Sequence, residues 1–123
     1  MQLTKNFHLD EFECKSGADM PDDVLDEIQF LAENLQKLRD RIGKSITITS
    51  GYRSPDHNRK IGGATVSQHI FGRAADIKVR GWEPDDIANE IQSLIDSGDM
   101  QQGGIGIYKS WIHYDTRGTR ARW

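Results

Sequence analysis

Apolar residues recur at three- and four-residue steps in two stretches of the chain, which is the pattern of an amphipathic helix. The first stretch covers residues 24–42, follows Pro21 and two aspartates, and stops at Gly43. The second stretch begins near Pro84, a residue that suits a first helical turn, and ends at Gly98. The pattern therefore predicts two main helices that serve as scaffold.

Strands are predicted where apolar and polar residues alternate. This alternation covers residues 45–50, 75–79 and 111–115. A Gly-rich stretch, residues 103–108, is joined to the last of these by a tight turn at residues 109–110, so the two should pair as a hairpin. The order of helix, strand, loop, strand, helix and hairpin predicts an α+β fold with a small, mostly antiparallel sheet.

Length and charge limit the classes of protein that fit. A chain of 123 residues predicts a single domain over residues 1–123, and a net charge of −3 gives no sign of a nucleic-acid partner. Three arginines near the end, Arg117, Arg120 and Arg122, are interpreted as a solvated tail. One Cys excludes an intrachain disulfide, and no apolar run is long enough to span a membrane. We expect a monomer.

Two segments supply candidate metal ligands. His69 and Asp76 stand seven residues apart with Gly72 between them, and His113 lies in the later strand. Gly72 weakens a helical reading and favours a loop, a turn and then a strand that carries Asp76. If that strand neighbours the strand over residues 111–115, Asp76 and His113 meet on one side of the sheet. The alternative is an ordinary His–Asp hydrogen bond or solvated side chains.

Two imidazoles and one carboxylate match a catalytic zinc site, in which three protein ligands leave a fourth position open. A closed structural site usually needs more cysteine than the single Cys14 offers. The residues therefore predict one Zn²⁺ ion on the open face of the sheet.

Four motifs occur in order along the chain, and together they resemble the M15 family of zinc peptidases. This is the group of D-alanyl-D-alanine carboxypeptidases and murein endopeptidases, and the likeness is greatest to its short, single-domain phage and bacterial members. The motifs are Ser50-Gly51-Tyr52-Arg53-Ser54-Pro55 with His57-Asn58, Ser67-x-His69-x-x-Gly72-x-Ala74-x-Asp76, Gly103-Gly104-Ile105-Gly106, and His113-x-Asp115 with Arg117-Gly118.

The resemblance implies a role for several residues. The family's zinc ligands fall on His69, Asp76 and His113. The arginine that binds the polarised carbonyl oxygen falls on Arg53, and a substrate contact falls on Ser67. The fold implied is the family's small α+β fold, with the sheet as the floor of the cleft.

The general base departs from the family pattern. Relatives carry an acidic residue three positions before the third ligand, where this chain has Ser110, which cannot accept a proton at neutral pH. Asp115 lies two residues after His113 on the same strand face. It is either the catalytic base or a carboxylate that orients His113. A third interpretation is a salt bridge to Arg117 or Arg53.

The resemblance implies a zinc-dependent peptidase that hydrolyses peptidoglycan stem or cross-link peptides at a bond involving a D-amino acid. The alternative is a weakly active or inactive zinc-containing module that binds wall peptides or builds a virion. The first residues run into polar sequence without an apolar segment, so no signal peptide is expected. This predicts a protein that is cytoplasmic at synthesis and acts at the cell wall if released, by phage lysis or as part of a virion.

Overall fold

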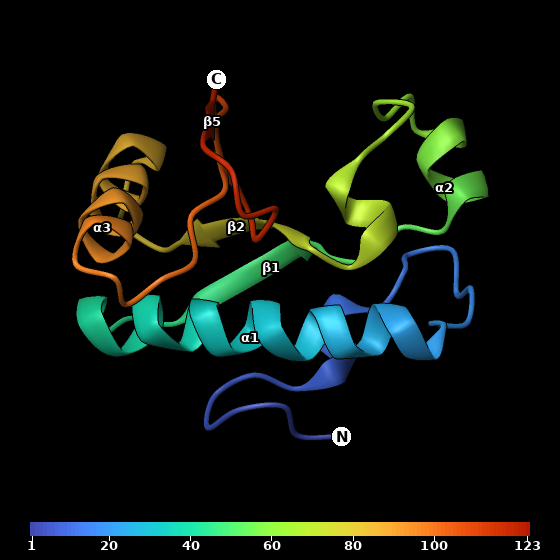
Figure 1. Ribbon diagram of the computed structural model, residues 1–123, viewed down its shortest axis with the longest axis horizontal. Helices are drawn as coiled ribbons and strands as arrows, with labels where there is room; N and C mark the ends of the chain where they lie inside the picture. The colour runs from blue at the N-terminus through green and yellow to red at the C-terminus, as the bar shows by residue number, and fades with distance from the viewer.

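The computed structural model describes residues 1–123 and has an α+β fold with three α-helices and a five-stranded sheet (Figure 1). The helices are α1 (Asp22–Ile42), α2 (Pro55–Lys60) and α3 (Pro84–Asp96). The strands are β1 (Ile46–Ser50), β2 (Ala74–Val79), β3 (Gly104–Ile107), β4 (Ile112–Asp115) and β5 (Ala121–Arg122). Two 3₁₀ helices are also present, η1 (Leu9–Phe12) and η2 (Gln68–Phe71).

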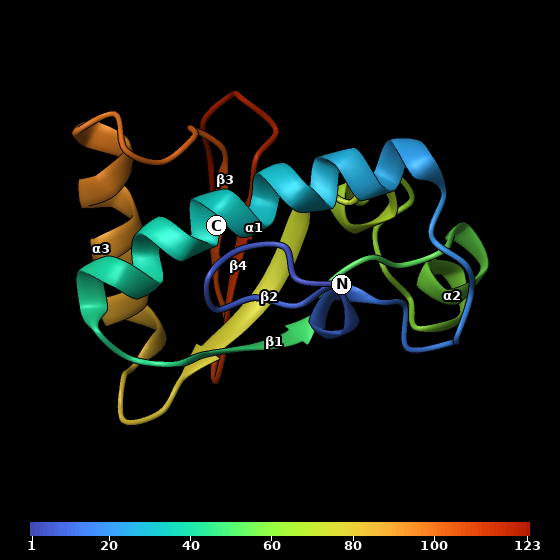
Figure 2. The same cartoon turned by 90° about the horizontal axis from the view of Figure 1, so that it is seen from below.

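The two main helices lie where the apolar pattern predicted them. Helix α1 crosses the sheet in Figure 2 and buries Ile28, Leu31 and Leu35 in the hydrophobic core. Gly43 ends it in the left-handed conformation, with φ of 65°, which glycine adopts without steric cost. Helix α3 adds Ile91 to the same core. The third helix, the six-residue α2, corresponds to the short turn that Pro55 favours.

The sheet has the strand order β1-β2-β4-β3-β5 and is mixed. The pairs β1–β2, β2–β4 and β3–β4 are antiparallel, whereas β3–β5 is parallel. The sequence predicted a mostly antiparallel sheet with two main helices. The structure corrects this prediction, because β5 pairs in parallel and α2 is a third helix. The prediction of a solvated tail is wrong for Arg122. Its side chain donates to Gln92 Oε1 and to the Gly103 carbonyl, and these bonds hold β5 beside β3.

Strands β2 and β4 bring two of the candidate ligands together. Asp76 pairs with His113 in the antiparallel register, so the two strands are neighbours, which was the condition for these side chains to meet on one side of the sheet. Their neighbours Ile77 and Tyr114 are fully buried in the hydrophobic core, so the polar pair occupies the other side of the strands. The sheet thus has one apolar face and one face that carries the candidate ligands Asp76 and His113.

The loop that carries His69 is pressed against α1. Gly72 ends η2 with φ of 74°, and a Cβ there would lie 2.8 Å from Val24 of α1. Only glycine allows both this conformation and this approach, so Gly72 fixes the position from which His69 reaches β2. None of the helices is both long and apolar enough to cross a membrane.

Candidate metal centre and substrate cavity

His69 is aimed by its own loop. Ser67 precedes η2, and its hydroxyl accepts a hydrogen bond from the His69 backbone N–H at 3.2 Å. The His69 ring donates from Nδ1 to the Gly51 carbonyl oxygen at 2.8 Å. The other ring nitrogen, Nε2, therefore carries a lone pair and lies 3.3 Å from Asp76 Oδ1.

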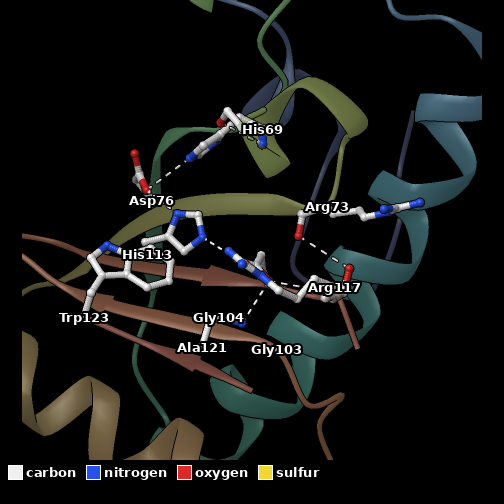
Figure 3. Close-up of polar contacts among 12 residues, drawn as sticks. His69, Arg73, Asp76, Gly103, Gly104, His113, Arg117, Ala121 and Trp123 are labelled. Atoms are coloured by element: carbon white, nitrogen blue, oxygen red, sulfur yellow. Dashed lines mark hydrogen bonds and ion pairs between the residues drawn. The ribbon is translucent and has the colours of Figure 1, made fainter. Parts of the chain in front are cut away.

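His113 is oriented in the same way but from its opposite nitrogen. Its Nε2–H donates to Asp115 Oδ2 at 2.6 Å, which leaves a lone pair on Nδ1. That nitrogen lies 3.4 Å from Asp76 Oδ1. Figure 3 shows His69, Asp76 and His113 pointing toward one another, with the Arg117 side chain beyond the far edge of the His113 ring.

Three electron-pair donors thus converge on one point. The donor atoms of His69, Asp76 and His113 all lie within 4.8 Å of one another, and all three residues are buried. A tetrahedral metal ion held at about 2.0–2.1 Å places its ligands roughly 3.3–3.4 Å apart, which matches the two nitrogen–oxygen separations. The donor set therefore fits a divalent cation, which offsets the repulsion between facing lone pairs.

The ionisation of Asp76 and His113 also fits a metal site. Burial alone would raise the pKa of Asp76, but hydrogen bonds and charge from His113 and His69 outweigh it and hold the pKa well below its usual range. Burial would lower the pKa of His113, yet its contacts with Asp115 and Asp76 raise it. Asp76 is therefore ionised at neutral pH, as a carboxylate ligand must be, and a metal ion competes with the proton of His113.

The Asp115 carboxylate is buried and surrounded by hydrogen-bond donors. It is 0% exposed and accepts bonds from the Gly104 backbone N–H at 2.8 Å and from Arg117 Nε at 2.9 Å. Burial would raise its pKa, but the bonds from His113, Arg117 and Gly104 hold it well below the usual range. A Cβ on Gly104 would lie 2.3 Å from the carboxylate, so the Gly-rich motif makes room for it.

Arg53 lies on the other side of the cluster. Its guanidinium donates to Asp76 Oδ2 at 3.2 Å and to Asn58 Oδ1 at 3.4 Å, while Nε donates to Ser50 Oγ. These contacts hold Arg53 beside the candidate ligands. Asn58 also donates to the Ala64 carbonyl and so links Arg53 to the neighbouring loop. The buried Asn58 had no assigned role in the sequence-based hypothesis.

A cavity of about 330 Å³ opens over the cluster. The three candidate ligands line it together with Arg53, Ser67 and Arg117, so the structure gathers the predicted site residues except Asp115 in one place. Three aromatic residues complete one side: Tyr108, Trp111 and Trp123. The sequence-based hypothesis gave these rings no role. Trp123 reaches the cavity through a parallel pairing of β3 with β5 that no local pattern indicates.

Ser110 and His57 lie away from the cluster. Ser110 is exposed in the β3–β4 turn and borders a different hollow, beside Lys78 and Trp82. His57 belongs to α2 and is not among the residues that line the cavity. Asp76 is the one carboxylate in that lining.

An α+β fold that gathers two oriented imidazoles and a carboxylate under an open cavity defines a candidate metal-dependent hydrolase. Comparison with known proteins gives the family: the sequence profile described as peptidase M15 matches residues 2–115, so the chain belongs to this family. A segment of 44 residues is also 46% identical to the zinc D-Ala-D-Ala carboxypeptidase of Streptomyces albus G. That match covers 35% of this chain and 17% of the relative's length.

Proposed function

We propose that this protein is a zinc-dependent peptidase that hydrolyses peptidoglycan stem or cross-link peptides at a bond involving a D-amino acid. The observation that carries the proposal is the convergence of His69 Nε2 and His113 Nδ1 on Asp76 Oδ1, at 3.3 Å and 3.4 Å, with all three donors within 4.8 Å of one another. Membership of the M15 family and the partial likeness to a zinc carboxypeptidase support it. One hydrophobic cluster of 25 buried residues supports a single catalytic domain over residues 1–123.

The three converging atoms hold one zinc ion on the sheet face opposite the apolar core. When bound, zinc supplies a Lewis acid that polarises the carbonyl of the scissile peptide bond. Gly51 and Asp115 bond the outer nitrogens of the two histidines and fix which nitrogen faces the metal.

Arg53 binds the substrate carbonyl oxygen and stabilises the negative charge that develops there. Its guanidinium is held within reach of the cluster by Asp76, Ser50 and Asn58, so its position is set before substrate binds. Ser67 borders the cavity with its hydroxyl near the His69 backbone, and it contacts the main chain of the substrate.

Asp115 acts as a positioning residue for His113. The imidazole ring separates it from Asp76, and its oxygens are already occupied by His113, Gly104 and Arg117. Of the two catalytic roles among the three interpretations that the sequence left open, this geometry favours orientation of His113 over proton transfer. The salt bridge to Arg117 belongs to the same arrangement, because Arg117 holds the carboxylate against the ring.

A second function is favoured by the cavity lining. A general base must lie within hydrogen-bond reach of the proton that it takes, and the cavity offers no carboxylate besides Asp76. Ser110, at the family's base position, is exposed beside another hollow. This favours a module that binds wall peptide through zinc and Arg53 with little or no cleavage, either in a wall-associated protein or in a virion.

Digestion of substrate separates the two functions. Zinc-loaded protein is incubated with purified peptidoglycan and with a peptide ending in D-Ala-D-Ala, beside the Asp76→Ala variant as the metal-free control. Release of D-Ala identifies a carboxypeptidase, and broken cross-links or stem peptides identify an endopeptidase. Zinc-loaded protein that binds the peptide in calorimetry but yields no product contradicts the peptidase and supports the binding module.

A further inference from the structure

Trp123 reaches the metal cluster from a segment beyond the part of the chain that the family profile matches, residues 2–115. Its indole ring lies with its centroid 4.9 Å from that of the His113 imidazole, tilted by 49°. The residue is 47% exposed and borders the cavity that the three candidate ligands line. Figure 3 shows it beside His113, next to the strands that carry Gly104 and Ala121.

The position of Trp123 is fixed by contacts on several sides. Its backbone N–H donates to the Ile105 carbonyl at 3.1 Å, and its carbonyl accepts from the Ile107 N–H at 2.8 Å. Its Nε1–H donates to the Tyr108 hydroxyl at 2.8 Å, and the Arg117 guanidinium lies 5.5 Å from the ring centroid. A side chain held this way loses little conformational freedom when a ligand packs against it.

Gly106 provides the space that the indole occupies. A Cβ at Gly106 would lie 2.4 Å from Trp123 Nε1 and Cε2, and the nearest atoms it would meet all belong to that indole. Gly106 has no positive φ, so its backbone conformation does not require glycine. The absence of a side chain on β3 is therefore explained by the ring that packs over it.

The aromatic surface continues from Trp123 along the β3–β4 turn. Tyr108 and Trp111 stack with ring centroids 4.6 Å apart and an interplanar angle of 5°, and both border the cavity. Exposed rings beside a polar cluster are typical of a ligand pocket, in which apolar walls supply contact area and a few polar groups set orientation. Large contiguous apolar patches are uncommon on the surface of monomeric proteins and mark interaction sites or ligand grooves.

We infer that Trp123 is a specificity-determining residue whose indole face forms the wall on which a small apolar residue of the substrate peptide packs beside His113. This rests on the proposed function, because it assigns a contact to the same substrate. The cavity of about 330 Å³ suits a few peptide residues rather than a large ligand. Arg53 and Ser67 meet the polar main chain, and Trp123 covers the side chain next to the cut.

The test compares Trp123→Ala and Trp123→Phe with Phe30→Ala, a control that removes an aromatic residue of similar exposure, 41%, from the outer side of α1. Steady-state kinetics on a stem peptide and calorimetric binding of that peptide are both measured. Trp123→Ala should raise KM and Kd about tenfold while kcat stays within about threefold, because a contact made equally in the ground and transition states changes KM. Trp123→Phe should recover most of the loss, and Phe30→Ala should change neither constant.

Gly106→Ala gives an independent test that keeps every aromatic side chain. The added methyl should displace the indole and reproduce most of the Trp123→Ala effect. Combined with Trp123→Ala it should add little, because the group it would strike is gone. Unfolding temperature and zinc affinity should stay near wild type in Gly106→Ala and in Trp123→Ala.

Two results would overturn the inference. They are an unchanged KM and Kd in Trp123→Ala, or additive losses in the double variant. A wild-type protein that binds the peptide without cutting it refutes the peptidase but leaves the binding test of Trp123 intact. A wild-type protein that cuts the peptide while Trp123→Ala behaves identically refutes only the inference.

Discussion

Two buried carboxylates face the same imidazole from opposite sides, and the structure treats them differently. Asp76 meets Nδ1 of His113, also faces His69 and Arg53, and borders the cavity. Asp115 meets Nε2 of His113, is 0% exposed, and is otherwise surrounded by Arg117 and the Gly104 backbone N–H. The Asp76 side has converging lone pairs that a cation would satisfy, whereas every contact on the Asp115 side is already a donor–acceptor pair.

Residue type and strand face therefore do not decide the role of a carboxylate in this site. Both aspartates lie on strands, and the pKa of each is held below its usual range by hydrogen bonds that outweigh burial. The two carboxylates differ in their surroundings. One carboxylate opens to a cavity that a ligand can enter, and the other holds a ring in place.

The largest expected effect is loss of metal from the Asp76 side. His69→Ala, Asp76→Ala and His113→Ala should each weaken zinc binding by more than about a hundredfold, since loss of an outer-sphere partner alone costs about 10–100-fold. His57→Ala is the matched control, because His57 lies in α2 outside the cavity lining. Metal content after dialysis against a chelator checks this. Full zinc occupancy in the three ligand variants, or its loss in His57→Ala, would refute the assignment.

Arg53→Ala tests the other group on the Asp76 side. We expect kcat to fall about a hundredfold, equivalent to roughly 3 kcal/mol, because a donor to the developing oxyanion is removed. Zinc should be retained, and the unfolding temperature of the zinc-loaded protein should change little, since the ion offsets the charge of Asp76. Arg59→Ala, at an exposed position in α2, is the control. A large loss of stability with activity retained would count against the role of Arg53.

The sequence predicted the Asp76 side better than the Asp115 side for a physical reason. Alternation in β2 and β4 fixed which residues share a face, and the register then brought Asp76 opposite His113. Alternation also placed Asp115 on that face, but it cannot say which ring nitrogen the carboxylate meets. That choice depends on side-chain rotation and on Arg117, a residue interpreted as part of a solvated tail.

The fold shows the same division between local pattern and distant contact. Helix α1 and the β3–β4 hairpin follow from apolar periodicity, Gly43 and the turn at residues 109–110. The parallel strand β5 has only two residues, too few for a period, and it depends on Arg122 reaching Gln92 of α3. Trp123, which lies at the end of that segment, could therefore not be placed beside the metal cluster from sequence alone.

Asp115→Asn tests whether the sealed carboxylate positions His113 or moves a proton. A positioning role predicts that zinc affinity falls about 10–100-fold, because the amide orients the ring less well. Activity should return when zinc is raised to saturation. Asp19→Asn, at an exposed loop position, is the control. Normal zinc affinity with activity abolished at saturating zinc would instead make Asp115 the general base.

The smallest effects are expected at two serines. Ser67→Ala should lower the free energy of unfolding by about 1 kcal/mol and raise KM a few-fold, because its hydroxyl caps η2 and borders the cavity. Ser110→Ala should change stability by less than about 0.5 kcal/mol and leave activity within twofold, since Ser110 is exposed beside another hollow. Denaturant unfolding and steady-state kinetics measure both. A strong loss of activity in Ser110→Ala would contradict the placement of the site.

The zinc assignment is tested by the X-ray absorption spectrum of the zinc-loaded protein at the zinc edge, recorded together with its metal stoichiometry. We expect one zinc per chain, two imidazoles, and only nitrogen and oxygen neighbours at about 2.0–2.1 Å. The Asp115→Asn variant at saturating zinc should give the same spectrum, and Asp76→Ala should bind no stoichiometric zinc. A sulfur neighbour, a third imidazole, or wild-type protein without stoichiometric zinc would contradict the assignment of His69, Asp76 and His113.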